Sequence, residues 1–362
     1  MNQEIAKKKF ICIDSRMLDS SGIGVYLERI IIGLILNGKY KISLLVKPKH
    51  VDYFKKYSSS NIRYKVLHSP IYHPFESIEL SLKIPRCDIY WSPHFNSSVF
   101  PTLAKERICT IHDVFHLANP QYYSKIKFYY IRLRYHISCL YSKKIISVSQ
   151  FTKCEIKKYF HKINERKITI IKNGLKFEDV APPMKNKESV SLRILFVGNL
   201  KPHKNIKCLL EAFKKINIPK ELIIIGETKG FLKPMEEKIL NEMHKDDDIF
   251  LLGRVDESKL KECYEKAHLL VFPSLYEGFG LPILEAFHYS LPCIISDISP
   301  FREVAGKAGL YFNPHDSFDL ADKIQMLMTD LKYRRHLISE GKKRLKFFSW
   351  EKSIESHIQL FK

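Results

Sequence analysis

The residue types best suited to chemistry gather in one segment, which runs from Glu277 to Glu285 and has the sequence EGFGLPILE. It follows a short apolar run, so we expect a strand, a loop and then a helix. Gly278 and Gly280 let the backbone approach a ligand closely, and Pro282 suits the first turn of a helix. The amides at the start of that helix favour a phosphate group. The two carboxylates are natural partners for the hydroxyl groups of a sugar.

Two further places combine glycine or histidine with the end of an expected strand. Gly22 and Gly24 follow the apolar run 10–14 and open a helical pattern, which is typical of phosphate binding but unspecific when so short. His112 and Asp113 end another apolar run. A histidine at such a place is either packed in the core or catalytic, and the spacing alone leaves both interpretations open.

Short β-branched runs alternate with longer helical patterns along the whole chain, which predicts parallel sheets covered by helices on both faces. A polar stretch at 178–191 interrupts the alternation and predicts a linker. We therefore expect an α/β protein with two Rossmann-like, doubly wound domains, residues 1–180 and 190–347. The expected strands are 10–14, 42–46, 88–91, 107–112, 144–148 and 167–172 in the first domain, and 192–198, 221–226, 248–253, 268–273 and 293–296 in the second.

The size and composition agree with two domains in a reducing compartment. The chain has 362 residues, which exceeds the length at which one core stops growing. Its eight cysteines form no C-x-x-C pair and indicate reduced core residues in a cytoplasmic protein. The sequence has no run of about 20 apolar residues and no pattern of a signal peptide, so we expect a cytoplasmic location.

The net charge of +21 predicts an anionic partner, either nucleic acid, anionic lipid or a phosphorylated substrate. The chain has no zinc-ligand spacing, no RNP-like aromatic pattern and no basic arm, so we do not expect nucleic acid. Aromatic, aliphatic and basic residues interleave from 121 to 144. A helix of this composition either lies at the inner face of an anionic membrane or packs its aromatic side chains on the first sheet and exposes its cations.

The segment from Glu277 to Glu285 resembles the E-x7-E signature of the retaining glycosyltransferases of family 4, which have the GT-B architecture of two Rossmann-like domains facing across a cleft. Other stretches are similar to the same family and follow in the same order: 14–26, 111–113, 147–149, 196–205 and 297–304.

The resemblance implies a nucleotide-diphosphate sugar as donor, with no metal or other cofactor. Glu285 would bind the ribose, Glu277 the transferred sugar, and Lys204 would neutralise the leaving diphosphate. Further residues would line the donor from one domain or the other: the amides of Gly278, Phe279, Gly280 and Leu281, then Arg254 near the base, and Gly22, Gly24, His112 and Asp113 from the first domain.

The chain departs from the family just before Lys204. Many relatives carry an arginine here, where this chain has Asn199 and His203. Asparagine supplies no charge, and histidine supplies one only when protonated, so the second phosphate cation is in question. Arg254 is the candidate substitute.

The resemblance also bears on mechanism and substrates. The leaving phosphate would itself help to deprotonate the attacking hydroxyl on the same face of the sugar. The stretch 14–26 is similar to transferases that use GDP-mannose in polysaccharide assembly, so the best expectation is mannose transfer to a glycan or lipid-linked glycan. A last helix at 350–362, with Ser349 as its N-cap, would return to the first domain. The alternatives are an enzyme like the nucleotide-sugar epimerases and a catalytically weakened binding protein.

Overall fold

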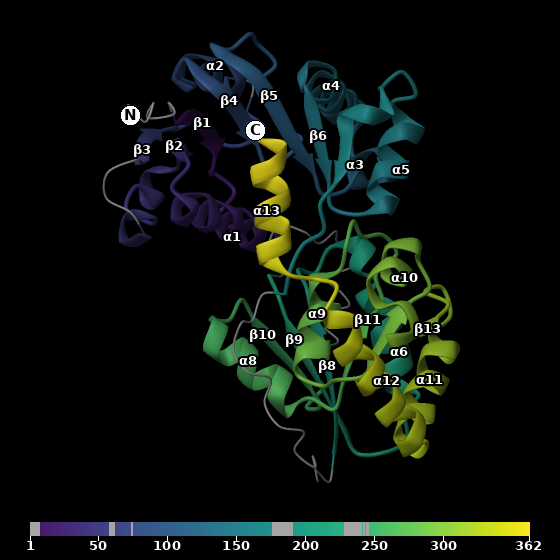
Figure 1. Cartoon of the computed structure of the whole chain (residues 1–362). Helices are drawn as coiled ribbons and strands as arrows, with labels where there is room; N and C mark the ends of the chain where they lie inside the picture. The colour runs from purple at the N-terminus through teal and green to yellow at the C-terminus, as the bar shows by residue number, and fades with distance from the viewer. Residues whose placement is uncertain are drawn as a thin grey trace. The chain divides into compact units, whose positions relative to one another are not determined.

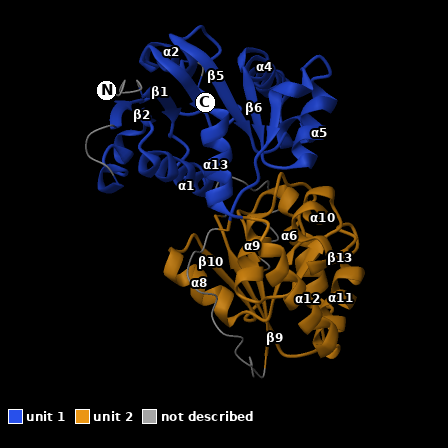
Figure 2. Ribbon diagram, viewed as in Figure 1, with its two compact units in different colours: residues 1–174, 349–362 blue, residues 175–348 orange. Residues whose placement is uncertain are grey.

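A computed structural model describes residues 8–57, 62–73, 75–175, 191–227, 241, 243 and 246–362. The chain divides into two compact units (Figure 2). Unit 1 comprises residues 1–174 and 349–362, and unit 2 comprises residues 175–348. The predicted linker at 178–191 lies, apart from Ser191, outside the described residues.

Unit 1 is built on a parallel sheet, whose seven described strands have the order β3-β2-β1-β4-β5-β6-β7 (Figure 1). All of the strands predicted for this region are confirmed, and the edge strand β3 is an addition. The strands are β1 (Lys9–Asp14), β2 (Tyr40–Val46), β3 (Ile62–Val66), β4 (Cys87–Ser92), β5 (Ala104–Ile111), β6 (Lys144–Ser147) and β7 (Ile168–Ile170).

Helices cover both faces of this sheet. The chain steps from β1 to β2 to β3 in one direction and from β3 to β4 in the other, so right-handed connections place the intervening helices on opposite faces. The helices are α1 (Ser21–Asn37), α2 (Glu76–Lys83), α3 (Phe115–Ala118), α4 (Lys125–Tyr141) and α5 (Gln150–Tyr159), with short 3-10 turns at Pro48–His50, Lys55–Tyr57, Pro120–Tyr122 and Glu165–Lys167.

The side chains of β1 show this division. Ile11 and Ile13 join the hydrophobic cluster of α1, whereas Cys12 joins a second cluster with Leu80 of α2. All three are fully buried, as expected for a parallel strand that helices cover on both faces.

The last helix, α13 (Trp350–Leu360), belongs to unit 1 and packs against α1 (Figure 1). The hydroxyl of Ser349 accepts a hydrogen bond from the amide of Lys352, which confirms the predicted N-cap. Gly33 of α1 makes the close approach possible, because a Cβ at this position would lie 2.5 Å from the side chain of Ile354.

Unit 2 has a second parallel sheet, whose six described strands have the order β10-β9-β8-β11-β12-β13. Each predicted strand is present, and β13 is an addition. The strands are β8 (Leu192–Val197), β9 (Lys220–Ile225), β10 (Ile249–Gly253), β11 (Leu269–Phe272), β12 (Cys293–Ser296) and β13 (Gly309–Phe312). The described helices are α6 (Ile206–Lys214), α8 (Glu257–Lys266), α9 (Leu281–His288), α10 (Ser299–Ala305), α11 (Ser317–Thr329) and α12 (Leu331–Leu345), with 3-10 turns at Pro202–Lys204 and Gly306–Ala308.

The strand order reverses between β8 and β11 in unit 2 and between β1 and β4 in unit 1. Loops diverge at the carboxyl ends of such strand pairs and leave a crevice in which doubly wound sheets bind ligands. The residues that follow these four strands are therefore the candidates for ligand binding.

Candidate active site

The loops after β8 and β11 bring Lys204 and Glu277 together at the reversal point of unit 2. The ammonium group of Lys204 pairs with Oε1 of Glu277, and both side chains are 15% exposed. The hydroxyl of Ser274 donates a hydrogen bond of 2.9 Å to the same oxygen. The Lys204 ammonium also lies 5.2 Å from the centroid of the Phe272 ring, within reach of a cation–π interaction. Two residues that are 73 positions apart in the sequence thus form one ion pair at the expected ligand-binding edge.

Asn205 fixes the loop that carries Lys204. It adopts a left-handed conformation with φ of 56°, and its side-chain amide donates to the carbonyls of Pro273 at 3.1 Å and Pro314 at 2.7 Å. The amide of Leu275 donates to the carbonyl of His203 at 2.7 Å. These bonds join the loops after β8, β11 and β13. Asn205 is a structural member of the site that was not selected from the sequence.

The glycine-rich turn begins α9 as predicted from its sequence. Gly280 has a φ of 110° and precedes the first residue of the helix, and Pro282 lies in the first turn. A side chain at residue 280 would be strained by this φ, and its Cβ would lie 3.0 Å from the ring of Phe301. The side chain of Phe279 is buried and contacts Phe348, so only the backbone of Phe279 can serve a ligand.

Glu285 lies within α9 and is 6% exposed. The hydroxyl of Tyr264, on α8, donates a hydrogen bond of 2.6 Å to its Oε2, and the Tyr264 ring stacks on Tyr289. Burial, reinforced by the adjacent carboxylate, raises the pKa of Tyr264 well above its usual value, which keeps the hydroxyl protonated as a donor. Tyr264 therefore fixes the orientation of the second carboxylate of the motif.

Asn199 and Arg254 have partners outside this ion pair. Oδ1 of Asn199 accepts a hydrogen bond of 3.1 Å from the amide of Glu227, and thereby ties the loop after β8 to the loop after β9. The Arg254 side chain, 65% exposed, lies 3.5 Å from the Glu227 carboxylate. An exposed pair of this length contributes little stability, so Arg254 has the freedom to change partner.

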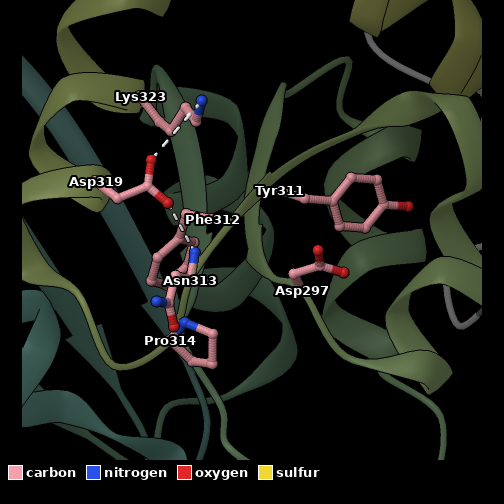
Figure 3. Close-up of a pocket in the computed structure, with 7 residues that line it drawn as sticks. All are labelled: Asp297, Tyr311, Phe312, Asn313, Pro314, Asp319 and Lys323. Carbon is pink, nitrogen blue, oxygen red and sulfur yellow. Dashed lines mark hydrogen bonds and ion pairs between the residues drawn. The ribbon is translucent and has the colours of Figure 1, made fainter.

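A shallow pocket of about 390 Å³ lies beside these loops, at the carboxyl ends of β12 and β13 (Figure 3). Asp319 accepts a hydrogen bond of 2.7 Å from the amide of Asn313, and Lys323 lies 3.7 Å from the same carboxylate. Both oxygens of Asp297 accept hydrogen bonds from Arg302, at 2.5 and 2.6 Å. The bond between Asp319 and Asn313 holds the loop that supplies the Pro314 carbonyl to Asn205.

In unit 1, His112 directly follows β5. Its Nε2 lies 2.9 Å from the carbonyl of Pro93, which can only accept, so Nε2 carries the proton. Burial lowers the pKa of His112, which favours the neutral ring. The adjacent Asp113 has a local task, since its Oδ1 accepts a hydrogen bond from the amide of Phe115 at the start of α3.

Gly22 and Gly24 both lie in the first turn of α1. A Cβ at Gly24 would lie only 2.3 Å from the carbonyl oxygen of Leu18, so the preceding turn excludes any side chain there. Close backbone packing thus accounts for Gly24.

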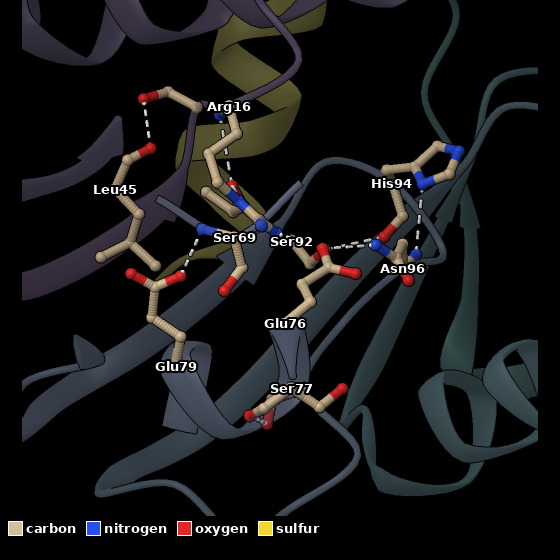
Figure 4. Close-up of polar contacts among 12 residues, drawn as sticks. Arg16, Leu45, Ser69, Glu76, Ser77, Glu79, Ser92, His94 and Asn96 are labelled. Carbon is tan, nitrogen blue, oxygen red and sulfur yellow. Dashed lines mark hydrogen bonds and ion pairs between the residues drawn. The ribbon is translucent and has the colours of Figure 1, made fainter. Parts of the chain in front are cut away.

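A buried polar cluster follows β1 and β4 at the reversal point of unit 1 (Figure 4). Arg16, 2% exposed, donates to both oxygens of Asp14 at 2.8 and 2.7 Å and lies 2.8 Å from the carboxylate of Glu76. Glu76 also accepts a hydrogen bond of 2.7 Å from Asn96, which in turn accepts one from Arg134. Two cations and two carboxylates neutralise one another away from water. The stretch 14–26 is a recognisable motif in the sequence, but no local pattern marks Glu76, Asn96 or Arg134 as partners of Arg16.

The helix predicted at 121–144 is α4, and its exposure differs from the packing expected for an ordinary surface helix. Tyr135 packs inward, as predicted, on Phe95. Arg134 is buried, however, whereas Ile126, Tyr129 and Leu133 are exposed. The prediction that this helix exposes its cations and packs its aromatic side chains is therefore wrong for Arg134 and Tyr129.

Two family models match the chain in succession. Residues 54–179 match the model "Glycosyltransferase Family 4", and residues 181–344 match "Glycosyl transferases group 1". The chain belongs to glycosyltransferase family 4. It has the GT-B fold, and the alternative of a nucleotide-sugar epimerase is wrong.

Relatives of this glycosyltransferase include O-antigen chain mannosyltransferase B of Escherichia coli, which is 28% identical over 76% of this chain and 74% of that protein. The O-antigen chain mannosyltransferase RfbU of Salmonella typhimurium is 29% identical over 76% of this chain and 78% of that protein. Among solved structures, Anabaena HepE in complex with UDP and glucose is similar with a TM-score of 0.78 and 14% identity, over 97% of this chain and 99% of that one.

Proposed function

We propose that this glycosyltransferase transfers a hexose from a nucleotide-diphosphate sugar to a hydroxyl of a glycan or lipid-linked glycan, with retention of anomeric configuration. The sugar we favour is mannose and the donor GDP-mannose, because both bacterial relatives described above carry the name of O-antigen mannosyltransferases. The complex of HepE with UDP and glucose supports a nucleotide-sugar donor for this fold.

The ion pair between Lys204 and Glu277 carries this proposal. A diphosphate bound near the start of α9 would compete with Glu277 for the Lys204 ammonium, and the released carboxylate would be free to accept hydrogen bonds from sugar hydroxyls. A cation fixed where negative charge develops on the leaving group stabilises the transition state electrostatically. In the proposed same-face mechanism, the departing diphosphate would itself act as the base that deprotonates the incoming hydroxyl.

Glu285 and His112 take the remaining roles in the proposal. Glu285, oriented by Tyr264, would bind the ribose. His112 of unit 1 would act on the sugar through Nδ1, the ring nitrogen that bears the lone pair when Nε2 donates to Pro93. Of the predicted donor residues, Asn199 is proposed as a support of the loop, and Arg254 as the second phosphate cation. A donor site without metal also remains part of the proposal.

Thermal stability of the purified protein against GDP-mannose, UDP-glucose, UDP-N-acetylglucosamine and dTDP-glucose tests the donor. A ligand at 100 times its Kd stabilises the folded state by about 2.7 kcal/mol, so the correct donor raises the melting temperature selectively. We expect the rise with GDP-mannose, and its loss in Glu285→Ala. A higher melting temperature with a different nucleotide sugar would refute only the choice of GDP-mannose as donor. An unchanged melting temperature with all four nucleotide sugars would refute the nucleotide-sugar site. Proton NMR of the first transferred product then reports the anomeric configuration.

We also propose that the outer face of α4 contacts an anionic membrane, which suits a lipid-linked acceptor. Ile126, Tyr129, Leu133 and Leu140 recur at helical spacing on this face, and Ile126 is 86% exposed. Residues 114–154 contain seven lysine and arginine residues and no aspartate or glutamate. Apolar side chains beside cations, without acidic neighbours in the chain, match the composition of helices that lie at membrane interfaces.

The neighbouring helix α2 extends this face. Arg134 of α4 donates to the hydroxyl of Ser77 on α2, so the two helices lie side by side, and the chain direction places both on the same side of the sheet. Leu82 on α2 is 80% exposed. Within the described residues, no helix is long and apolar enough to cross a membrane, so the proposed contact is peripheral.

Sedimentation with vesicles tests this contact. We expect the protein to pellet with phosphatidylcholine vesicles that contain phosphatidylglycerol, to pellet less as salt rises, and to remain in the supernatant as Ile126→Ser/Leu133→Ser. Leu36→Ser is the matched control, because Leu36 is exposed on α1, on the opposite face of the sheet. Equal pelleting of both variants would refute this surface.

A further inference from the structure

We propose that His357, near the end of the chain, is a positioning residue for His112: it holds the ring of Tyr26 in place against the His112 imidazole. His357, Tyr26 and Thr110 are all fully buried within unit 1. They come from α13, α1 and β5, and a chain of hydrogen bonds joins them. The role of His112 in sugar transfer rests on the proposed function, whereas the geometry of these hydrogen bonds does not.

The direction of each hydrogen bond follows from its neighbours. Nδ1 of His357 lies 2.7 Å from the carbonyl of Ser353 and must donate to it. Burial lowers the pKa of His357 to about 4, so the ring is neutral and its Nε2 accepts from the Tyr26 hydroxyl at 2.7 Å. The Tyr26 oxygen then accepts from Thr110 at 3.0 Å.

Trp91 completes the chain at its other end. Its indole nitrogen donates to the Thr110 hydroxyl at 3.0 Å. The order of donation is therefore Trp91 to Thr110 to Tyr26 to His357 to the helix backbone. Each hydroxyl in this order donates once and accepts once, so a change at one end alters the bonding of every member.

This series of hydrogen bonds holds both the ring contact of His112 and its hydrogen-bond acceptor. The Tyr26 ring meets the His112 ring edge-on, with centroids 4.9 Å apart and an interplanar angle of 86°. Thr110 lies on β5, two residues before His112, and Trp91 lies two residues before Pro93, whose carbonyl accepts the hydrogen bond from His112 Nε2. Both the ring contact and the backbone acceptor of His112 are thus anchored by the same four side chains.

The consequence concerns the tautomer of His112. A ring held against Tyr26 with Nε2–H directed at Pro93 presents Nδ1 as a hydrogen-bond acceptor. If the hydroxyl of Tyr26 loses its anchor, the edge-on contact loosens and the imidazole samples both tautomers. The helix that ends the chain would then control the protonation state of a residue in the proposed site.

NMR of protein labelled with 15N-histidine tests this inference without any substrate. Long-range proton–nitrogen correlations report the tautomer of each ring, and His112→Gln and His357→Gln assign the two sets of signals. We expect Nδ1–H at His357 and Nε2–H at His112 in the native protein. In Tyr26→Phe and His357→Phe we expect averaged nitrogen shifts at His112, and a kcat reduced roughly tenfold with the donor KM unchanged.

The controls separate positioning from general stability. Tyr40→Phe removes another buried hydroxyl bond to α13, the 3.2 Å bond to the Ile358 carbonyl, and should leave the His112 signals as they are. His357→Gln retains an acceptor for Tyr26 and should restore a single His112 tautomer. Unchanged His112 signals in Tyr26→Phe, or an Nε2–H tautomer at His357, would overturn the inference. If the native protein shows the expected tautomers of His112 and His357 but has no transfer activity, the result would instead count against the proposed function.

Discussion

The hydroxyl of Tyr264 donates a 2.6 Å hydrogen bond to the buried carboxylate of Glu285, across two helices that flank the same strand. Tyr264→Phe removes this donor and leaves the carboxylate with one partner fewer. Loss of a hydrogen bond to a buried charged group costs about 1–3 kcal/mol, so we expect a corresponding fall in the free energy of unfolding, measured in urea. The affinity for the nucleotide should fall as well. Stability equal to that of the native protein would show that the bond is dispensable.

The ion pair between Lys204 and Glu277 predicts opposite effects of neutralising its two members. Lys204→Gln should weaken GDP binding by roughly a hundredfold, as expected for loss of a charged contact to phosphate. Glu277→Gln removes the competitor for the ammonium, so GDP should bind at least as tightly as before while sugar transfer is lost. Calorimetric titration with GDP measures the difference. Arg254→Gln is the comparison variant, because it removes an exposed cation. An equal loss of GDP affinity in all three variants would refute the idea that Glu277 competes with the diphosphate for Lys204.

Buried His357 predicts that the stability of unit 1 depends on pH. In the unfolded chain it protonates near its ordinary pKa of 6.5, whereas the folded unit resists protonation until about pH 4. Between these two pH values the unfolded state therefore binds more protons than the folded state. The contribution of neutral His357 to the free energy of unfolding is complete above pH 6.5 and is lost as the pH falls toward 4. The loss amounts to about 3 kcal/mol. Urea unfolding at pH 7.5 and 4.5 should show a smaller difference for His357→Gln than for the native protein.

Asn205 combines a left-handed backbone with two side-chain hydrogen bonds. Asn205→Gly relieves the backbone but removes both bonds, and Asn205→Ala adds the strain of the left-handed conformation, which costs about 1–2 kcal/mol. We therefore expect the alanine variant to be less stable than the glycine variant, and both less stable than the native protein. Denaturant unfolding measures these differences. Equal stability of all three would mean that the loop relaxes without cost.

The sheets and the turn before α9 were predictable because their signals are local. Buried parallel strands have continuous apolar sequences, and the glycines and proline between Glu277 and Glu285 mark a turn and a helix start by their own backbone preferences. The strand β3 was missed because it lies at the sheet edge, where Arg63 and Lys65 are exposed and interrupt the apolar pattern.

The polar interior of unit 1 was not predictable in the same way. Arg16, Glu76 and Arg134 are far apart in the sequence, and charged residues are exposed in most proteins, so nothing local indicates that they neutralise one another. Asn199 and Asp113 show a related limit. Their residue types suit a ligand, but their oxygens accept hydrogen bonds from nearby backbone amides, and only the loop geometry reveals this.

The insertion of unit 2 within unit 1 has a consequence for synthesis. The chain leaves unit 1 after Gly174 and returns to it at Ser349, and these two segments lie against each other. A Cβ on Gly174 would lie 2.3 Å from the backbone nitrogen of Trp350. A ribosome therefore completes all of residues 175–348 before it releases the helix that covers Trp91 and Tyr26. During this interval the nascent first unit keeps an apolar face open, while the second unit is free to fold. Premature termination within the last helix would leave that face open permanently and make the product a target for chaperones and proteases.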